Sequence, residues 1–294
     1  MAGGKYQHTK HGTYGQSLGT CYAEGMELYL QFAKQLAIEV SVIMLQHFKI
    51  GVATTAKPQA GNTPVAIADE AINALVIAKV RVLFPTHAVL SEKQSLPVEN
   101  ADYTWVCDPI DGTAPFAAGI PINVFAIALV SKTDGQPVLA VIYDPYMKRL
   151  YHAVKGKGAF INDTPIHVNA VGTLADAAVD TTSSRSEIID SVGLKTHILT
   201  TCYRQMSIGS VLYAAAMVAN GQIAAQLFVG SGAHDVAAAK LIVEEAGGMV
   251  TDIFGQPQRY DQKVGGAIIS NGRLHQALSQ ITNAYKIKEH PIDG

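Results

Sequence analysis

Apolar residues recur at helical spacing near the start of the chain and predict two helices there. The first predicted helix covers residues 21–48 and carries this apolar series: Leu28, Phe32, Leu36, Val40, Ile43 and Phe48. Glycine and proline residues over 50–64 indicate a loop. A second helix is predicted over 66–83, because Pro85 marks its end.

Beyond residue 100 the pattern changes to short apolar or alternating runs that are separated by turn-forming residues, and such runs predict strands. The predicted strands are 104–107, 123–131, 137–143, 149–154 and 159–161. Because these strands follow one another closely, they predict an antiparallel sheet.

After about residue 172 strands alternate with helices. The predicted strands are 177–182, 197–201, 223–228 and 267–270, and the predicted helices are 185–192, 210–220 and 233–246, with a last helix after residue 270. This alternation favours an α/β layer. The sequence therefore predicts a mobile tail over 1–18, an α+β domain over 19–171 with an antiparallel sheet, and a mixed α/β domain over 172–294.

Composition limits the class of protein. Of the 294 residues 48% are hydrophobic and 16% are charged, so the chain can bury a substantial core. The net charge of −2 argues against a nucleic-acid polymer as partner. No apolar run is expected to approach the roughly 20 residues of a membrane span, and the first residues lack a signal-peptide core. Three cysteines without a C-x-x-C pair indicate a soluble protein of the reducing cytoplasm.

Residues 105–113 (Trp-Val-Cys-Asp-Pro-Ile-Asp-Gly-Thr) are the most informative for chemistry. An apolar strand leads into Asp108 and Asp111, which should face one opening. Gly112 and Thr113 can begin a short helix whose N–H groups face an anion. Two carboxylates beside an anion site are consistent with a hard divalent cation between them and a phosphate. An ordinary turn is the alternative, because these residue types all favour turns.

Further segments favour the metal site over an ordinary turn. They match motifs of a known enzyme family at 108–113, 234–239, 243–248 and 155–160, with weaker matches at 68–69 and 90–93. In their order and spacing along residues 57–270 they resemble the inositol monophosphatase family, within the superfamily of lithium-sensitive and fructose-bisphosphatase-like phosphatases. The resemblance implies a layered αβαβα sandwich of the sugar-phosphatase type. It also implies Mg²⁺-dependent hydrolysis of a small soluble phosphate monoester by a metal-activated water.

The resemblance further assigns roles to individual residues. The implied ligands of two Mg²⁺ ions are Glu92, Asp108, the backbone carbonyl of Ile110, Asp111 and Asp235. Thr113 and Glu92 would orient the attacking water and receive its proton, and Asp69 would reach a possible third Mg²⁺ through water. Asp235 also opens a helix, where aspartate is a favourable cap in any protein. The ten histidines include no H-x-x-x-H pair, so a histidine metal site is not expected.

The sequence departs from the family pattern at three places. Lys93 replaces an acidic residue, and it could weaken a third metal or act as a counter-charge. His234 stands in place of a tryptophan ahead of the metal aspartate. Phe228 stands where inositol-specific members carry a glutamate that binds sugar hydroxyls, which argues against inositol phosphate as the dedicated substrate. The expected substrate-binding residues are Gly112, Thr113, Ser184, Arg185, Ser210, Phe228 and His234.

Several functions remain open from the sequence. A phosphatase of the same fold could act on a 3′-phosphoadenosine nucleotide, on histidinol phosphate, or on fructose 1,6-bisphosphate with Arg185 or Arg204 in a distal pocket. A protein of another class, a catalytically weak regulator that keeps the fold for interactions, would also be consistent with Lys93, His234 and the unusual tail. The resemblance implies a homodimer in either case.

Overall fold

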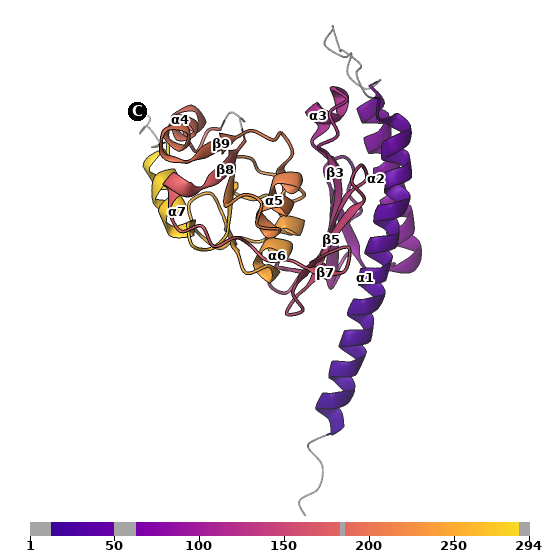
Figure 1. Ribbon diagram of the computed structural model, residues 1–294. Coiled ribbons are helices and arrows are strands. Elements are labelled where there is room, and N and C mark those ends of the chain that lie inside the picture. The colour runs from indigo at the N-terminus through magenta and orange to yellow at the C-terminus, as the bar shows by residue number, and fades with distance from the viewer. Residues whose placement is uncertain (1–12, 50–62, 183–185, 288–294) are drawn as a thin grey trace, which may run out of the picture.

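The chain folds into five stacked layers of helices and sheets, in the order αβαβα (Figure 1). The computed structural model describes residues 13–49, 63–182 and 186–287, with side chains from Gly25 onward. The helices are α1 (Thr13–His47), α2 (Pro64–Leu83), α3 (Thr113–Ala117), α4 (Ser191–Thr201), α5 (Val211–Ala219), α6 (Ala237–Glu245) and α7 (His275–Ala284). The layered α/β class expected from the family resemblance is thereby confirmed.

The first sheet has seven strands in sequence order. They are β1 (Ala88–Ser91), β2 (Tyr103–Asp111), β3 (Val124–Ser131), β4 (Pro137–Asp144), β5 (Arg149–Val154), β6 (Ala159–Ile161) and β7 (Thr164–Pro165). From β2 onward every pairing is antiparallel, as the closely spaced runs predicted. The pattern missed β1, which pairs with β2 in parallel and brings residue 92 to the edge of the sheet where β2 ends.

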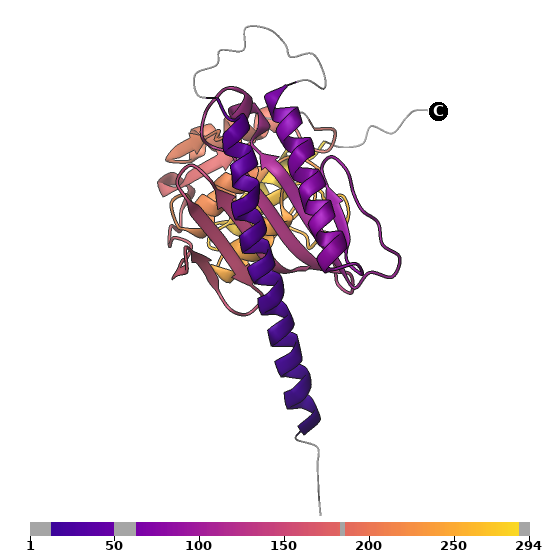
Figure 2. The same cartoon turned by 90° about the vertical axis from the view of Figure 1, so that its right-hand side faces the viewer.

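Helices α1 and α2 cover the outer face of this sheet, and α1 extends beyond the body of the molecule (Figure 2). Among the described residues, Gly25–His47 is the stretch that is long and apolar enough to cross a membrane, with mean hydropathy 1.4. The expectation that no such run exists was therefore wrong. Nevertheless Leu36, Val40 and Met44 of this helix are buried in the cluster that lies against the sheet, so the helix contributes to the core of the sandwich.

Strand β3 shows how the two faces of the first sheet are filled. Large side chains face α1 and α2, namely Phe125, Ile127 and Leu129. Small side chains face α5 and α6, namely Val124, Ala126, Ala128 and Val130. Successive strand residues point to opposite faces, so this alternation places large side chains on one face and small side chains on the other. The small residues let α5 and α6, which are rich in alanine, lie close to the end of β2.

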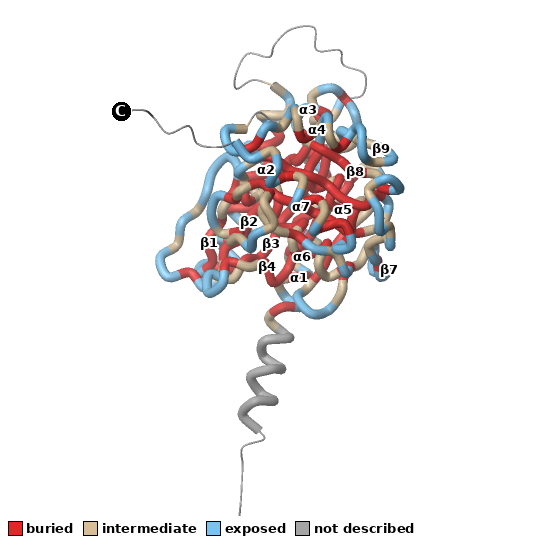
Figure 3. Tube along the Cα trace, turned by 90° about the vertical axis from the view of Figure 1, so that its left-hand side faces the viewer, coloured by how far each residue is buried: buried red, intermediate tan, exposed pale blue. Residues whose placement is uncertain are grey.

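The second sheet packs on the other side of α5 and α6. Buried residues fill the interior of the molecule, and exposed residues surround it (Figure 3). The strands of this sheet, in spatial order, are β11 (Met249–Thr251), β12 (Ala267–Ser270), β10 (Ala225–Phe228), β8 (Ala178–Thr181) and β9 (Arg204–Met206). Helices α4 and α7 cover its outer face, where Leu194, Ile198 and Leu278 are buried. A 3₁₀ turn, η1 (Leu174–Asp176), precedes β8.

The sequence pattern was wrong around residue 195. It predicted a helix over 185–192 and a strand over 197–201, whereas the structure has one helix, α4, across the second range. The run His-Ile-Leu-Thr-Thr favours strands locally, but Leu194 and Ile198 bury one helical face and Asp190 caps the first turn through the Gly193 N–H. The short strands β7, β9 and β11 also escaped the pattern, because two or three residues carry little periodicity.

The chain is helical from Thr13, so α1 includes residues 13–18 of the predicted tail, and the mobility of that tail stays a prediction. The rest of that predicted tail, and residues 183–185, lie outside the described residues. All strands of the first sheet precede residue 171 and all strands of the second follow it. The division into two domains at that point stays a prediction, since α5 and α6 bury residues against both sheets.

Candidate metal and phosphate site

Two buried carboxylates end strand β2. Asp108 and Asp111 are 3% and 5% exposed. Between them the pairing with β3 shifts, because Asp108 lies opposite Ala126 while Asp111 lies opposite Val124. Three steps along β2 thus match two along β3, which is a β-bulge that changes the direction of side chains. The Asp108 Oδ1 accepts a hydrogen bond of 3.1 Å from the Ile110 N–H, which fixes that carboxylate within the bulge.

Gly112 turns the chain sharply after the bulge. Its φ is +89°, and a Cβ atom there would lie 2.9 Å from both the Ile122 carbonyl oxygen and the Ser210 Cβ. Only glycine combines that φ with so close an approach. The turn starts α3 and leaves Thr113 exposed at its first position, beside the two aspartates.

Asp111 joins the first sheet to the start of α5. Its Oδ1 accepts a hydrogen bond of 3.1 Å from the Val211 N–H, and its Oδ2 accepts one of 2.7 Å from the Leu212 N–H. The Ser210 hydroxyl also donates to Oδ2. A helix N-terminus has unpaired N–H groups and a positive dipole end, so a buried carboxylate is well placed there. Ser210, expected to contact substrate, therefore acts here as the N-cap of α5 and a partner of Asp111.

Asp235 approaches the same point from the loop before α6. One ligand atom each of Asp108, His234 and Asp235 lies within 4.8 Å of the others, a spacing that could hold a metal ion. The His234 Nε2 is 3.7 Å from the Asp235 Oδ2. Asp235 is not a side-chain cap of the helix, since α6 begins at Ala237 and its N-cap residue, Val236, makes no such bond. The sequence predicted no histidine metal site, whereas His234 lies within reach of the two aspartates, so its place in a metal site is a candidate that the sequence interpretation did not include.

Glu92, Asp69 and Lys93 form a second group beside this cluster. Glu92 follows β1, and Asp69 lies on the buried face of α2. The Lys93 Nζ is 2.8 Å from the Glu92 Oε1 and 3.5 Å from the Asp69 Oδ2. Lys93 thus pairs with both carboxylates, as expected of a counter-charge. The buried Asp69 Oδ1 has no hydrogen-bond partner.

The electrostatics of these groups fit a cation. Burial, then Asp111, Asp235 and Glu92, hold the pKa of Asp108 well above its usual range. Burial also raises the pKa of Asp235 to about 8, with Asp111 and Glu92 adding to the effect. Carboxylates that repel one another in a buried site are stabilised by a divalent cation, and hard oxygen donors suit Mg²⁺. The residues present therefore fit such an ion.

This electrostatic arrangement predicts that the metal-free protein loses stability as pH rises from 6 to 8. The pKa of Asp235 is about 8 when folded against 3.8 for a free aspartate, so the folded chain holds a proton that the unfolded chain has released. The resulting stability is present below the unfolded pKa and is lost as pH rises through the folded pKa, at about 1.4 kcal/mol per pH unit for one such group. Asp69, whose pKa burial raises to about 6, adds to the loss only up to that pH.

Saturating Mg²⁺ should remove this pH dependence, because bound carboxylates are ionised throughout. Thermal unfolding at pH 6 and pH 8, with Mg²⁺ and with chelator, measures the effect. We expect the Tm difference between the two conditions to be larger at pH 8. A difference that is the same at both pH values would contradict the clustered, buried carboxylates as the metal site.

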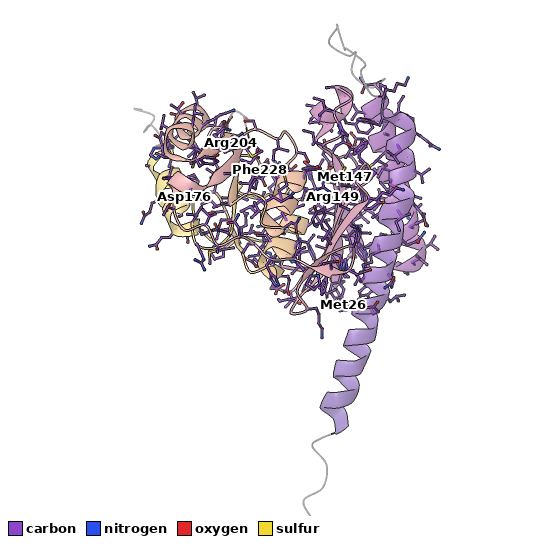
Figure 4. The ribbon with its side chains drawn as sticks, viewed as in Figure 1. Met26, Met147, Arg149, Asp176, Arg204 and Phe228 are labelled. Carbon is purple, nitrogen blue, oxygen red and sulfur yellow. The ribbon has the colours of Figure 1, made fainter. Side chains whose placement is uncertain are left out.

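A cleft of about 490 Å³ opens onto these residues. It is lined by Glu92, Asp108, Ile110, Asp111, Gly112, Thr113, Ala114, Thr181, Thr182, Ser207, Gly209, Val211, Phe228, Gly230, His234 and Asp235. The cleft thus gathers the expected metal ligands together with Thr113, Phe228 and His234. Phe228 ends β10 in the second half of the molecule, across from the first sheet that carries Arg149 (Figure 4). Asp69 does not line the cleft.

Other expected contacts fall elsewhere. Ser184 and Arg185 lie outside the described residues. Arg204 is exposed at the start of the edge strand β9, where its guanidinium lies over the Tyr203 ring, and it is not among the described residues that line the cleft. The described part of the cleft therefore offers no arginine for a distal phosphate.

The sequence interpretation missed Thr181 and Thr182, which line the cleft, and the supporting Asp180. Asp180 accepts a hydrogen bond of 2.8 Å from the Ile208 N–H and so holds the loop that leads to Ser210. Burial raises its pKa to about 6. The one available signal was the polar Asp-Thr-Thr run at the end of a predicted strand, a common place for site residues in an α/β layer.

The five layers and the carboxylate cluster between the sheets define the class of sugar-phosphatase-like folds. The sequence profile of the inositol monophosphatase family matches residues 26–286, so the chain belongs to that family. The Nus factor SuhB of Pasteurella multocida is 30% identical over 227 residues, which cover 76% of this chain and 81% of that protein.

The chain is also similar to two proteins whose names are those of enzymes. The fructose-1,6-bisphosphatase/inositol-1-monophosphatase of Thermotoga maritima is 30% identical over 216 residues, covering 73% of this chain and 80% of that protein. The solved inositol monophosphatase of Anabaena (Nostoc) is 27% identical, with a TM-score of 0.76, and covers 89% of this chain and 97% of that one. The family predicted from residues 108–113 and the accompanying motifs is confirmed.

Proposed function

We propose that this protein is a Mg²⁺-dependent phosphatase that hydrolyses a small soluble phosphate monoester. The convergence of Asp108 and Asp235 at one point of a cleft, with Glu92 and Asp111 on its walls, is the observation that carries the proposal. Buried carboxylates that crowd together without cations oppose folding, and their use in binding divalent ions accounts for them.

Five groups of the cleft are the proposed metal ligands. Glu92, Asp108, the Ile110 carbonyl, Asp111 and Asp235 would hold two Mg²⁺ ions. Mg²⁺ bound by these residues would supply the positive charge that activates water as a nucleophile and stabilises the leaving oxygen. Asp111 offers chiefly Oδ1 for this purpose, because Oδ2 already accepts hydrogen bonds from both Ser210 and Leu212.

Three residues handle the water and the phosphate. The Thr113 hydroxyl and the Glu92 carboxylate, which line the same cleft, orient the attacking water and accept its proton. The backbone N–H groups of Gly112 and Thr113 bind the phosphate oxygens. Asp69 contributes from outside the cleft, by holding Lys93 against Glu92.

The proposed substrate is small, and the cleft wall at Phe228 does not recognise the hydroxyl groups of inositol. A cleft of about 490 Å³ suits one sugar or amino-alcohol phosphate. Phe228, 5% exposed at the cleft wall, offers an apolar ring and no hydrogen-bond acceptor. We therefore propose that the preferred substrate is a sugar, histidinol or nucleotide phosphate, and that inositol phosphate is a poorer one. We also propose that the protein is cytoplasmic, that lithium inhibits it, and that it forms a homodimer.

Phosphate release from a panel of esters tests the function. The panel includes inositol, fructose, histidinol and 3′-nucleotide phosphates, each with Mg²⁺, with Mn²⁺ and with chelator. Mn²⁺ is included because carboxylate, carbonyl and water oxygens suit it as they suit Mg²⁺. We expect metal-dependent release that is much faster for one ester than for the rest and that stops with chelator.

An interaction role is the second candidate, because the relative in Pasteurella multocida is named a Nus factor. A folded protein that binds divalent metal but releases no phosphate from any ester would favour this role over catalysis. Metal-independent release would contradict the proposed mechanism instead.

A further inference from the structure

Lys93 places a positive charge among the carboxylates of the site. Its ammonium lies between Glu92, at 2.8 Å, and Asp69, at 3.5 Å. The Asp69 side chain is 2% exposed, and the Lys93 side chain is 37% exposed. One partner of this pair is therefore almost fully removed from water, which distinguishes it from an ordinary surface ion pair.

Asp69 needs this charge. On the buried face of α2 it has an Oδ1 without a hydrogen-bond partner, and no positive group besides Lys93 is paired with it among the described residues. An ionised carboxylate that is buried without a cation is costly, so a nearby cation stabilises the ionised form of Asp69. The ammonium of Lys93 already supplies that cation.

The formal charges lead to a count of metal ions. Asp69, Glu92, Asp108, Asp111 and Asp235 bring five negative charges, and Lys93 returns one. Two divalent cations balance the remainder in the free protein. An acidic residue at position 93 would instead leave six negative charges, which three divalent cations balance.

We propose that the Lys93 ammonium takes the place of one divalent cation and limits this site to two. This inference rests on the proposed metal site and adds to it the number of ions. An ammonium at hydrogen-bond distance from Glu92 leaves no room for an ion that bridges Glu92 and Asp69. Its charge also repels a dication at such short range. Lys93 thus acts as a positioning residue that holds Glu92 and Asp69 in place before any metal binds.

Counting bound Mn²⁺ by electron paramagnetic resonance tests the inference without measuring turnover. Wild-type protein, Lys93→Glu and Lys93→Met are titrated with Mn²⁺ to millimolar concentration, and the bound ions per chain are fitted. We expect two ions for the wild type and three for Lys93→Glu, with the third bound at least about tenfold more tightly than any further ion in the wild type. Lys93→Met, which removes the ammonium and adds no ligand, should bind a third ion more weakly than Lys93→Glu.

Lys157→Glu is the matched control. Lys157 is exposed in the turn between β5 and β6 and does not line the cleft, so its substitution makes the same change in net charge elsewhere. It should bind two ions, like the wild type. Circular dichroism confirms that each variant is folded.

The possible outcomes separate the inference from the proposed function. Equal numbers of Mn²⁺ in wild type and folded Lys93→Glu would overturn the role of Lys93 while leaving the metal site intact. Three ions in the wild type would overturn it as well. A wild type that binds no Mn²⁺ would refute the metal site itself.

Discussion

Asp108→Asn is expected to lower metal-dependent phosphate release by on the order of a thousandfold while the protein stays folded. Asp108 lies where the ligand atoms of His234 and Asp235 converge, and both proposed metal ions use its carboxylate. Asparagine removes the negative charge at nearly the same volume. Its carbonyl oxygen can still accept the hydrogen bond from the Ile110 N–H, so the bulge in β2 is kept.

The stability of this variant gives a second readout. In the metal-free protein, burial and the neighbouring carboxylates raise the pKa of Asp108, which means that its ionised form is held unfavourably. Neutral asparagine relieves that repulsion. We therefore expect Asp108→Asn to unfold in chelator at the wild-type Tm or above it, and to gain much less Tm than the wild type when Mg²⁺ is added.

Asp176→Asn is the control for a change of one charge. Asp176 is exposed in the 3₁₀ turn η1, on the outer side of the second half (Figure 4), and should keep full turnover. If folded Asp108→Asn retained both turnover and the response to Mg²⁺, Asp108 could not be the central ligand, and the assignment of the site would be wrong.

The part of the site that could be predicted from sequence is the part that is local in sequence. Residues 108–113 carry strand, bulge, glycine turn and helix start within one short run, so their types and spacing already indicate two carboxylates at one opening. Glu92 and Asp235 come from distant strands and loops. Only the family resemblance placed them at the same point, and the structure brings both to the cleft.

What the sequence could not predict depends on tertiary packing. The strand-favouring residues at 197–201 form part of helix α4 because Leu194 and Ile198 must cover the second sheet. Strand β1 is four residues long and gains its place by parallel pairing with β2. Likewise, no local pattern shows that Lys93 reaches across to Asp69 on another element.

Asp111 is the clearest case of a role that only the fold reveals. The sequence resemblance makes it a metal ligand, and the structure adds that it accepts hydrogen bonds from Ser210, Val211 and Leu212, about 100 residues away along the chain. It therefore joins the first sheet to the helix layer between the sheets. Among the described residues, the Asp108 carboxylate accepts a hydrogen bond only from the Ile110 N–H, in its own strand.

Asp111→Asn is accordingly expected to destabilise the protein by about 2–4 kcal/mol, even in chelator. Asparagine presents one carbonyl oxygen and one NH₂ group to three donors, so at least one backbone N–H of α5 is left buried without an acceptor. Relief of charge burial offsets part of this loss, since burial raises the pKa of Asp111, although its hydrogen bonds act in the opposite direction. The offset is smaller than for Asp108 because the aspartate at 111 is stabilised by those donors.

Urea denaturation in chelator measures the difference. Ser210→Ala removes one of the three donors and the N-cap of α5, and should cost about 1–2 kcal/mol, which gives an internal scale for the larger loss. Asp108→Asn should show no loss in the same assay, although it removes the same charge from the same strand. If Asp111→Asn proved as stable as Asp108→Asn, the link between β2 and α5 would contribute nothing to folding, and Asp111 would be a ligand alone. A loss in Asp111→Asn that is absent from Asp108→Asn would show that the Asp111 carboxylate, through its hydrogen bonds to the start of α5, stabilises the packing of β2 against that helix.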